Sequence, residues 1–190
     1  MKRLLAAVVL VLAVVSMGFG QGFGFKGVGG GIGFISASMD DGNGGSSSLS
    51  GFLIAAHADL GEITKDITLV PDITYWSASK DPLKLSDFSI NVNAHYNIAV
   101  QGQFKPYVGA GLGYNSLSSE VEIPSFTIPG FGTVGGGTVS GSSSRLGINL
   151  LVGANYKLND MLTLVIEPRY VIASDFNHFT AKVGITYALK

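Results

Sequence analysis

The sequence predicts an all-β protein, an eight-stranded antiparallel up-and-down transmembrane β-barrel preceded by a signal peptide. Three observations lead to this fold class. Hydrophobic residues make up 46% of the 190 residues and charged residues only 13%, against roughly 25% charged in an ordinary soluble domain. No internal apolar run reaches the ~20 residues of a transmembrane helix. Apolar and polar residues instead alternate over many short segments, which is typical of strands that cross a bilayer.

The N-terminal segment, residues 1–20, has the parts of a secretory signal peptide. Lys2 and Arg3 are basic, residues 4–15 are almost wholly apolar, and small residues follow at Gly18 and Gly20. The apolar run is short for a membrane span, although an uncleaved anchor is the alternative. The sequence therefore predicts export, with a single barrel domain over residues 21–190.

Evenly spaced alternating segments in the remaining chain predict a meander of strands. The clearest segment runs from Phe88 to Ile98, where Phe88, Ile90, Val92, Ala94, Tyr96 and Ile98 share one face and only polar side chains occupy the other. The second segment likewise places residues from Phe52 to Leu60 on one apolar face. In the first segment, residues 23–35, the apolar residues switch from one face to the other, which predicts a bulge near residues 27–31. The eight strands are expected at residues 23–35, 52–60, 67–77, 88–98, 106–115, 145–156, 162–172 and 179–190.

The connections are expected to alternate in length. Those at residues 61–66, 99–105 and 157–161 are short, whereas those at 36–51 and 116–144 are long and rich in Gly and Ser. An even number of strands with alternating short turns and longer loops places both termini on the short-turn side. The two long connections read as low-complexity, mobile loops.

The positions of the aromatic residues along the strands indicate that the apolar faces meet lipid and not a soluble core. Aromatic residues gather at both ends of the strands, with Ile, Leu, Val and Ala between them, as in the two girdles of a membrane barrel. Gly109, Gly111 and Gly113 lie on the opposite face of one strand, where small residues would leave room inside a narrow barrel. The girdle residues are Tyr75, Phe88, Tyr96, Tyr114, Tyr156, Tyr170, Phe179 and Tyr187.

Several of these segments resemble a known family. The leader, residues 105–114 (KPYVGAGLGY), residues 167–170 (EPRY) and the last alternating strand look like the small eight-stranded outer-membrane barrels of diderm bacteria, the OmpA-like and Opa-like group. The resemblance covers the whole mature chain and implies an outer-membrane location. Such barrels commonly end on an aromatic residue recognised by the barrel assembly machinery, and Tyr187 would serve that purpose here.

With the apolar faces outward, the inward face carries a set of polar residues of both charge signs. An eight-stranded interior is narrow enough to be filled by side chains, so we interpret this set as a structural network, with a gated pore as the alternative. The strand register predicts that Glu167 faces Lys182 across the last hairpin, with Arg169 one step away. The full set is His57, Asp72, Asn91, Asn93, His95, Arg145, Asn149, Glu167, Arg169 and Lys182.

The sequence carries no catalytic, cofactor or metal motif, so we expect a protein that is not an enzyme and binds no cofactor or metal. The chain has no cysteine, which excludes disulfides, thiolate catalysis and cysteine-based metal sites. Its net charge of −1 argues against nucleic-acid binding. Its expected partners are outer-membrane lipid, the assembly machinery and an unidentified surface ligand, and it is expected to be a monomer. The predicted role is structural or surface interaction through the long loops. The alternatives are a narrow pore for small solutes and a soluble lipocalin-like barrel.

Overall fold

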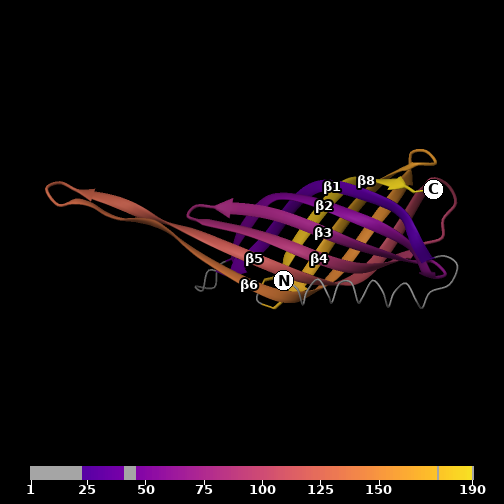
Figure 1. Ribbon diagram of the computed structural model, residues 1–190, viewed down its shortest axis with the longest axis horizontal. Helices are drawn as coiled ribbons and strands as arrows, with labels where there is room; N and C mark the ends of the chain where they lie inside the picture. The colour runs from indigo at the N-terminus through magenta and orange to yellow at the C-terminus, as the bar shows by residue number, and fades with distance from the viewer. Residues whose placement is uncertain (1–22, 41–45, 175, 190) are drawn as a thin grey trace.

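The computed structural model describes residues 23–40, 46–174 and 176–189, which form eight strands closed into a barrel. Each strand pairs antiparallel with its neighbour in the chain, and β1 closes the ring against β8 (Figure 1). The predicted fold class is therefore confirmed. Over the same residues no helix is long and apolar enough to span a bilayer. The strands are β1 (Phe23–Asp40), β2 (Ser46–Thr64), β3 (Ile67–Lys80), β4 (Leu83–Asn97), β5 (Phe104–Ile128), β6 (Gly132–Lys157), β7 (Leu162–Ala173) and β8 (His178–Ala188).

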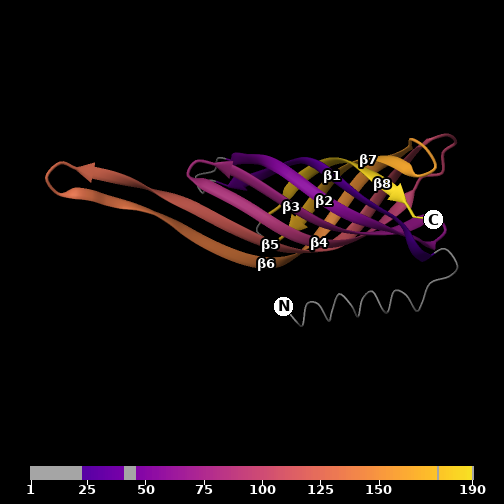
Figure 2. The same cartoon turned by 45° about the horizontal axis from the view of Figure 1, so that its top comes forward.

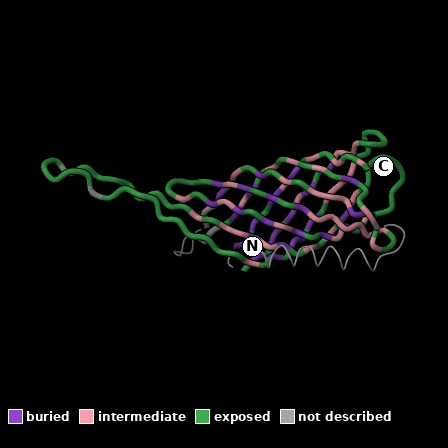
Figure 3. The backbone as a smooth tube through the Cα atoms, viewed as in Figure 1, coloured by how far each residue is buried: buried purple, intermediate pink, exposed green. Residues whose placement is uncertain are grey.

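The apolar faces of the strands point outward. Ile32 is 71% exposed and Leu112 is 66% exposed, whereas Asn93 and Asn149 are fully buried. Figure 3 shows the same alternation of exposed and buried positions along the barrel wall. A soluble ligand-binding barrel would bury these apolar side chains and expose the amides. The lipid-facing orientation is thus confirmed, and the lipocalin-like alternative is wrong.

Aromatic side chains lie on the outer surface near both ends of the barrel. Contacts between neighbouring strands join some of them, with ring centroids 6.1 Å apart for Phe34 and Phe179 and 6.5 Å apart for Phe52 and Tyr75. Tyr114 is half-buried, and the other seven predicted girdle residues are exposed, namely Tyr75, Phe88, Tyr96, Tyr156, Tyr170, Phe179 and Tyr187.

The two long connections predicted as mobile loops are largely strand. β5 and β6 remain paired from Ser116 and Ser144 out to Ile128 and Gly132, so residues 116–144 form a continuous hairpin. Its tip projects well beyond the other strands (Figures 1 and 2). Residues 36–40 and 46–51 are also paired, between β1 and β2. The prediction failed because Gly and Ser composition indicates loops locally, while a continued register supplies backbone hydrogen bonds whatever the side chains.

Two local phase predictions need correction. The irregularity expected near residues 27–31 of β1 lies earlier, between Phe23 and Gly27. In β2, Leu60 was expected to face lipid but is only 4% exposed. The register of β2 against β3 shifts between His57 and Glu62, and Gly61 adopts a φ of 78° there. An irregularity of this kind turns the following side chains to the other face of the sheet.

The glycine-rich inner face of β5 makes room for amide side chains. A methyl group added at Gly111 would run into the side chain of Asn93, and one added at Gly113 would run into Asn91. These glycines therefore let β4 place two asparagines at the centre of a narrow barrel, which is the purpose that the sequence pattern indicated.

Candidate functional site

Strand register brings polar side chains from β3, β4, β6, β7 and β8 into the middle of the lumen. Asp72 faces Asn91 across the β3–β4 ladder, and Glu167 faces Lys182 across the β7–β8 ladder. Because alternate residues of a strand share a face, Arg169 points inward together with Glu167. β3 and β4 lie across the ring from β7 and β8, so only closure of the barrel makes side chains of the two groups neighbours.

Arg169 links the two acidic groups of this cluster. Its Nη2 lies 2.6 Å from Oδ2 of Asp72, and its Nη1 lies 3.2 Å from Oδ1 of the same carboxylate. Nη2 also donates to Oε1 of Glu167 at 2.8 Å. The pairing with Asp72 uses both oxygens, a geometry that the planar guanidinium favours and the ammonium group of lysine does not provide.

The Asp72 carboxylate accepts further hydrogen bonds from its own strand and from β4. Asn91 donates to Oδ1 at 2.8 Å, Asn93 to Oδ2 at 2.7 Å and the hydroxyl of Thr74 to Oδ1 at 2.9 Å. Asn149 of β6 completes the layer by donating to the side-chain oxygens of Asn91 at 3.0 Å and Asn93 at 2.9 Å. Buried polar groups of this kind are stable only when they are paired in this way.

Glu167 is held from three directions. Lys182 Nζ lies 3.0 Å from its Oε1, the pairing that the strand register predicted. Tyr107 of β5 donates its hydroxyl to Oε2 at 2.8 Å. The Tyr107 ring stacks on the ring of His95 at a centroid distance of 4.4 Å, and His95 Nε2 lies 3.8 Å from Oε2, too far for a direct hydrogen bond.

The polar cluster is closed and electrically balanced. Asp72 and Glu167 are opposed by Arg169 and Lys182, and all four residues are less than 10% exposed. Charges in such a site are tolerated because each has an opposite partner and its hydrogen bonds are satisfied. The arrangement fills the middle of the lumen with immobilised side chains and fixes the relative positions of the strands that contribute them.

A cluster of apolar side chains fills the lumen between the polar cluster and the end of the barrel that carries the projecting hairpin. Trp76 is 1% exposed and stacks on Phe176 with ring centroids 5.9 Å apart. From the sequence, Trp76 either faces inward near the outer rim, as parity indicates, or marks the rim itself, and the structure places it inside. The cluster comprises Ile35, Ala37, Leu49, Leu53, Trp76, Ala78, Leu85 and Phe176.

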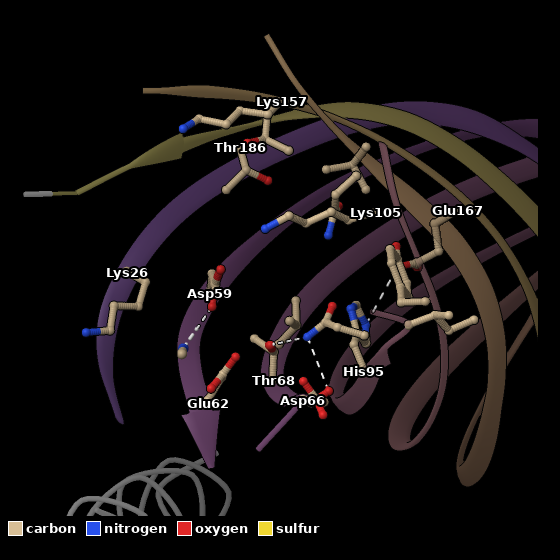
Figure 4. A pocket seen from close by; sticks show the side chains of 18 of the residues that line it. Lys26, Asp59, Glu62, Asp66, Thr68, His95, Lys105, Lys157, Glu167 and Thr186 are labelled. Atoms are coloured by element: carbon tan, nitrogen blue, oxygen red, sulfur yellow. Dashed lines mark hydrogen bonds and ion pairs between the residues drawn. The ribbon is translucent and has the colours of Figure 1, made fainter. Parts of the chain in front are cut away.

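A polar cavity of about 640 Å³ lies on the other side of the network, toward the short turns (Figure 4). Glu167, Lys182 and His95 form part of its wall, which also carries basic side chains such as Lys105 and acidic side chains such as Asp59. At its rim, Lys157 forms an ion pair with Asp160 at 2.8 Å, and this hydrogen bond lowers the pKa of the Asp160 carboxyl. Because Glu167 and Lys182 belong to both the cavity wall and the buried network, the cavity ends at that network.

Not every residue of the predicted lumen set joins the network. Arg145 lies at the outer rim, where it donates to the carbonyl of Ser174 at 2.8 Å and to the Ser143 hydroxyl at 2.7 Å. His57 bonds instead to Thr186 at 2.8 Å and lines the cavity. The remaining eight predicted residues are brought together. Arg145 diverges because parity assigns a face but gives no depth along the barrel.

Tyr107, like Thr74, is a network member that the predicted lumen set did not include. Alternation placed it on the inner face of β5 with Gly109 and Gly111, but nothing in the pattern indicated a hydrogen-bond partner. A single large aromatic residue on a glycine face was the available signal. Among the residues that the structure describes, no three His, Asp or Glu side chains gather in a way that would hold a metal ion.

Outward apolar faces, aromatic residues at both ends and a filled polar lumen define a small transmembrane β-barrel. The sequence matches the model of the family described as "Outer membrane protein beta-barrel domain" over residues 4–188. The chain belongs to this family and is an outer-membrane protein, in which the short-turn side faces the periplasm. Residues 1–20, the predicted signal peptide, lie outside the described part of the chain.

Solved structures of the same fold include two bacterial surface proteins. Neisserial surface protein A is 21% identical, with a TM-score of 0.62 over 85% of this chain and 97% of that one. Ail, the attachment invasion locus protein of Yersinia pestis, is 12% identical, with a TM-score of 0.52 over 87% and 99%. At these identities the likeness shows the fold alone. No curated protein matches the sequence significantly.

Proposed function

We propose that this protein is a closed outer-membrane barrel that displays the β5–β6 hairpin for contact with other surfaces, and that it is neither a solute channel nor an enzyme. The observation that carries the proposal is the combination of a filled lumen with a paired hairpin that extends past every other strand (Figure 1). A barrel built for transport would need an open path, whereas a display scaffold needs rigidity.

The buried network supports the scaffold role over the pore alternative. Arg169 contacts Asp72 and Glu167 at once, so opening a path would leave at least one buried charge without its partner. The apolar cluster around Trp76 lies in the same lumen on the outer side. A hydrated ion would have to pass both layers.

Shortening the hairpin tests this function. Val121 and Val139 face each other in the β5–β6 ladder at the last position where β5 pairs with β4. A two-residue Asn-Gly turn can therefore replace residues 122–138 and leave the pairing with β4 in place. The shortened protein is expected to reach the outer membrane in the same amount, because the barrel and its network are untouched. Cells that display it are expected to attach less to cultured cells, to coated surfaces or to one another than cells with the full chain. Unchanged attachment in all three assays at equal surface level would contradict the proposal.

Assembly in the membrane is the second part of the proposal. We infer that the barrel assembly machinery recognises β8, whose outward residues include Val183, Ile185 and Tyr187. The barrel is expected to be monomeric in its own membrane, since every strand is paired on both sides within the barrel wall.

A further inference from the structure

The β5–β6 hairpin has a polar stalk and an apolar tip. Near the barrel its strands carry Ser118, Ser119 and Glu120 on one side and a run of serines at 142–144 on the other. At the far end Phe126 is 68% exposed and Phe131 is 87% exposed. Phe131 exceeds the fractional exposure of the lipid-facing Ile32 and Leu112 of the barrel itself. Large apolar side chains so placed mark an interaction site.

The tip is uncharged over a long stretch. No Asp, Glu, Lys, Arg or His occurs from Ile123 to Ser144. Its polar side chains are small hydroxyls, which offer little directional recognition of a charged or sugar-rich ligand. Its Phe, Ile and Val side chains are of the same kinds as those that face lipid on the outer surface of this barrel. Aromatic side chains without charge favour the interface of a bilayer.

The position of the tip suits contact with a membrane other than its own. The first residue of β4, Leu83, pairs with Val121. Beyond Val121 the hairpin continues for roughly 25 Å at the rise of an extended strand. The tip points away from the periplasmic end, where the C-terminal strand finishes (Figure 2). Beyond Val121 the outer edges of the two strands are unpaired, which limits how deep the hairpin can enter lipid. The contact would therefore be confined to the turn and the aromatic residues beside it.

We propose that the tip of the β5–β6 hairpin, centred on Phe126 and Phe131, inserts into the interface of an opposing lipid bilayer. The binding is hydrophobic and independent of lipid charge, since the tip has no basic residue to attract anionic headgroups. This inference rests on the proposed surface-interaction role and names the partner as a lipid surface, as opposed to a protein or a second copy of the chain.

Co-flotation with protein-free vesicles tests the inference. The full chain is refolded into nanodiscs and mixed with vesicles of phosphatidylcholine alone. The nanodiscs are expected to float with the vesicles, equally well when anionic phosphatidylglycerol is added and at high salt. The double variant F126S/F131S is expected to bind the vesicles at least roughly tenfold more weakly, because both exposed rings are removed.

The matched control is V121S/V139S, which removes an exposed cross-strand apolar pair from the stalk. This variant is expected to float like the wild type, and the fluorescence of Trp76 reports an intact barrel in every variant. Absence of flotation would overturn the inference, as would binding that needs anionic lipid, equal binding by F126S/F131S, or self-association of the protein in detergent micelles, where no bilayer is present. If flotation fails while hairpin shortening still reduces cell attachment, the lipid partner is wrong and the surface role stands.

Discussion

Replacing Arg169 with methionine is expected to lower the free energy of unfolding by about 3–5 kcal/mol. The guanidinium bridges Asp72 and Glu167 at 2.6 and 2.8 Å, and the arginine is only 6% exposed. Without it, Asp72 keeps only neutral hydrogen-bond donors and Glu167 keeps only Lys182 as a close cationic partner. A buried carboxylate that loses its charge partner is costly because water cannot reach it.

Urea unfolding in lipid vesicles measures this loss, with Trp76 as the reporter since it is the single tryptophan and lies inside the barrel. Arg145→Met is the matched control. Its side chain lies at the outer rim and bonds a carbonyl and a hydroxyl there, so a change of about 1 kcal/mol or less is expected. Adding Asp72→Asn to Arg169→Met should recover part of the stability, because the cluster is then neutral again. Equal stability of Arg169→Met and wild type would show that the network does not hold the barrel together.

Val92→Arg is expected to destabilise the folded barrel by about 2–4 kcal/mol, the cost of a cation on the lipid face near the bilayer midplane. Val92 is 38% exposed on the outer face of β4, between the exposed aromatic residues Phe88 and Tyr96 of the two predicted girdles. Lipid offers no water to the guanidinium at that depth, and the lumen on the other side of the strand is already filled by Asn93.

Ile98→Arg is the depth control for this substitution. Ile98 is 41% exposed and follows β4 on the periplasmic side, beyond Tyr96. At an interface an arginine on the lipid face costs about 0–1 kcal/mol. The same urea titration compares the two variants. If Val92→Arg were as stable as Ile98→Arg, the position of the membrane around β4 would be wrong.

Periodicity was enough to predict that the chain forms eight strands in this order. The positions of the aromatic residues then predicted which face meets lipid, with Leu60 as an exception. A single alternating strand such as β4 does not show whether its apolar face meets lipid or a core. Eight such strands in one chain, taken together, do. The Glu167–Lys182 contact followed from the same reasoning, because a tight hairpin between β7 and β8 leaves little freedom of register.

The alternation of faces could not predict which inward side chains meet inside the closed barrel. Parity put Arg145 in the lumen but could not say that it lies at the rim, away from Asp72 and Arg169. Contacts across the ring, such as Tyr107 with Glu167, join strands that are distant in the sequence and meet only when the barrel closes. The β5–β6 hairpin was missed for another reason, since serine and glycine are poor strand formers and the hydrogen-bonded ladder overrides their preference.

Single-channel recording of the refolded protein in a planar bilayer tests the central claim most directly, which is that the buried network closes the lumen. Protein whose Trp76 emission shows a folded barrel is expected to leave the bilayer current at its baseline, because Asp72, Glu167, Arg169 and Lys182 fill the path between the periplasmic cavity and the outer side. Discrete, reproducible conductance steps from the same preparation would contradict a closed scaffold and favour a pore.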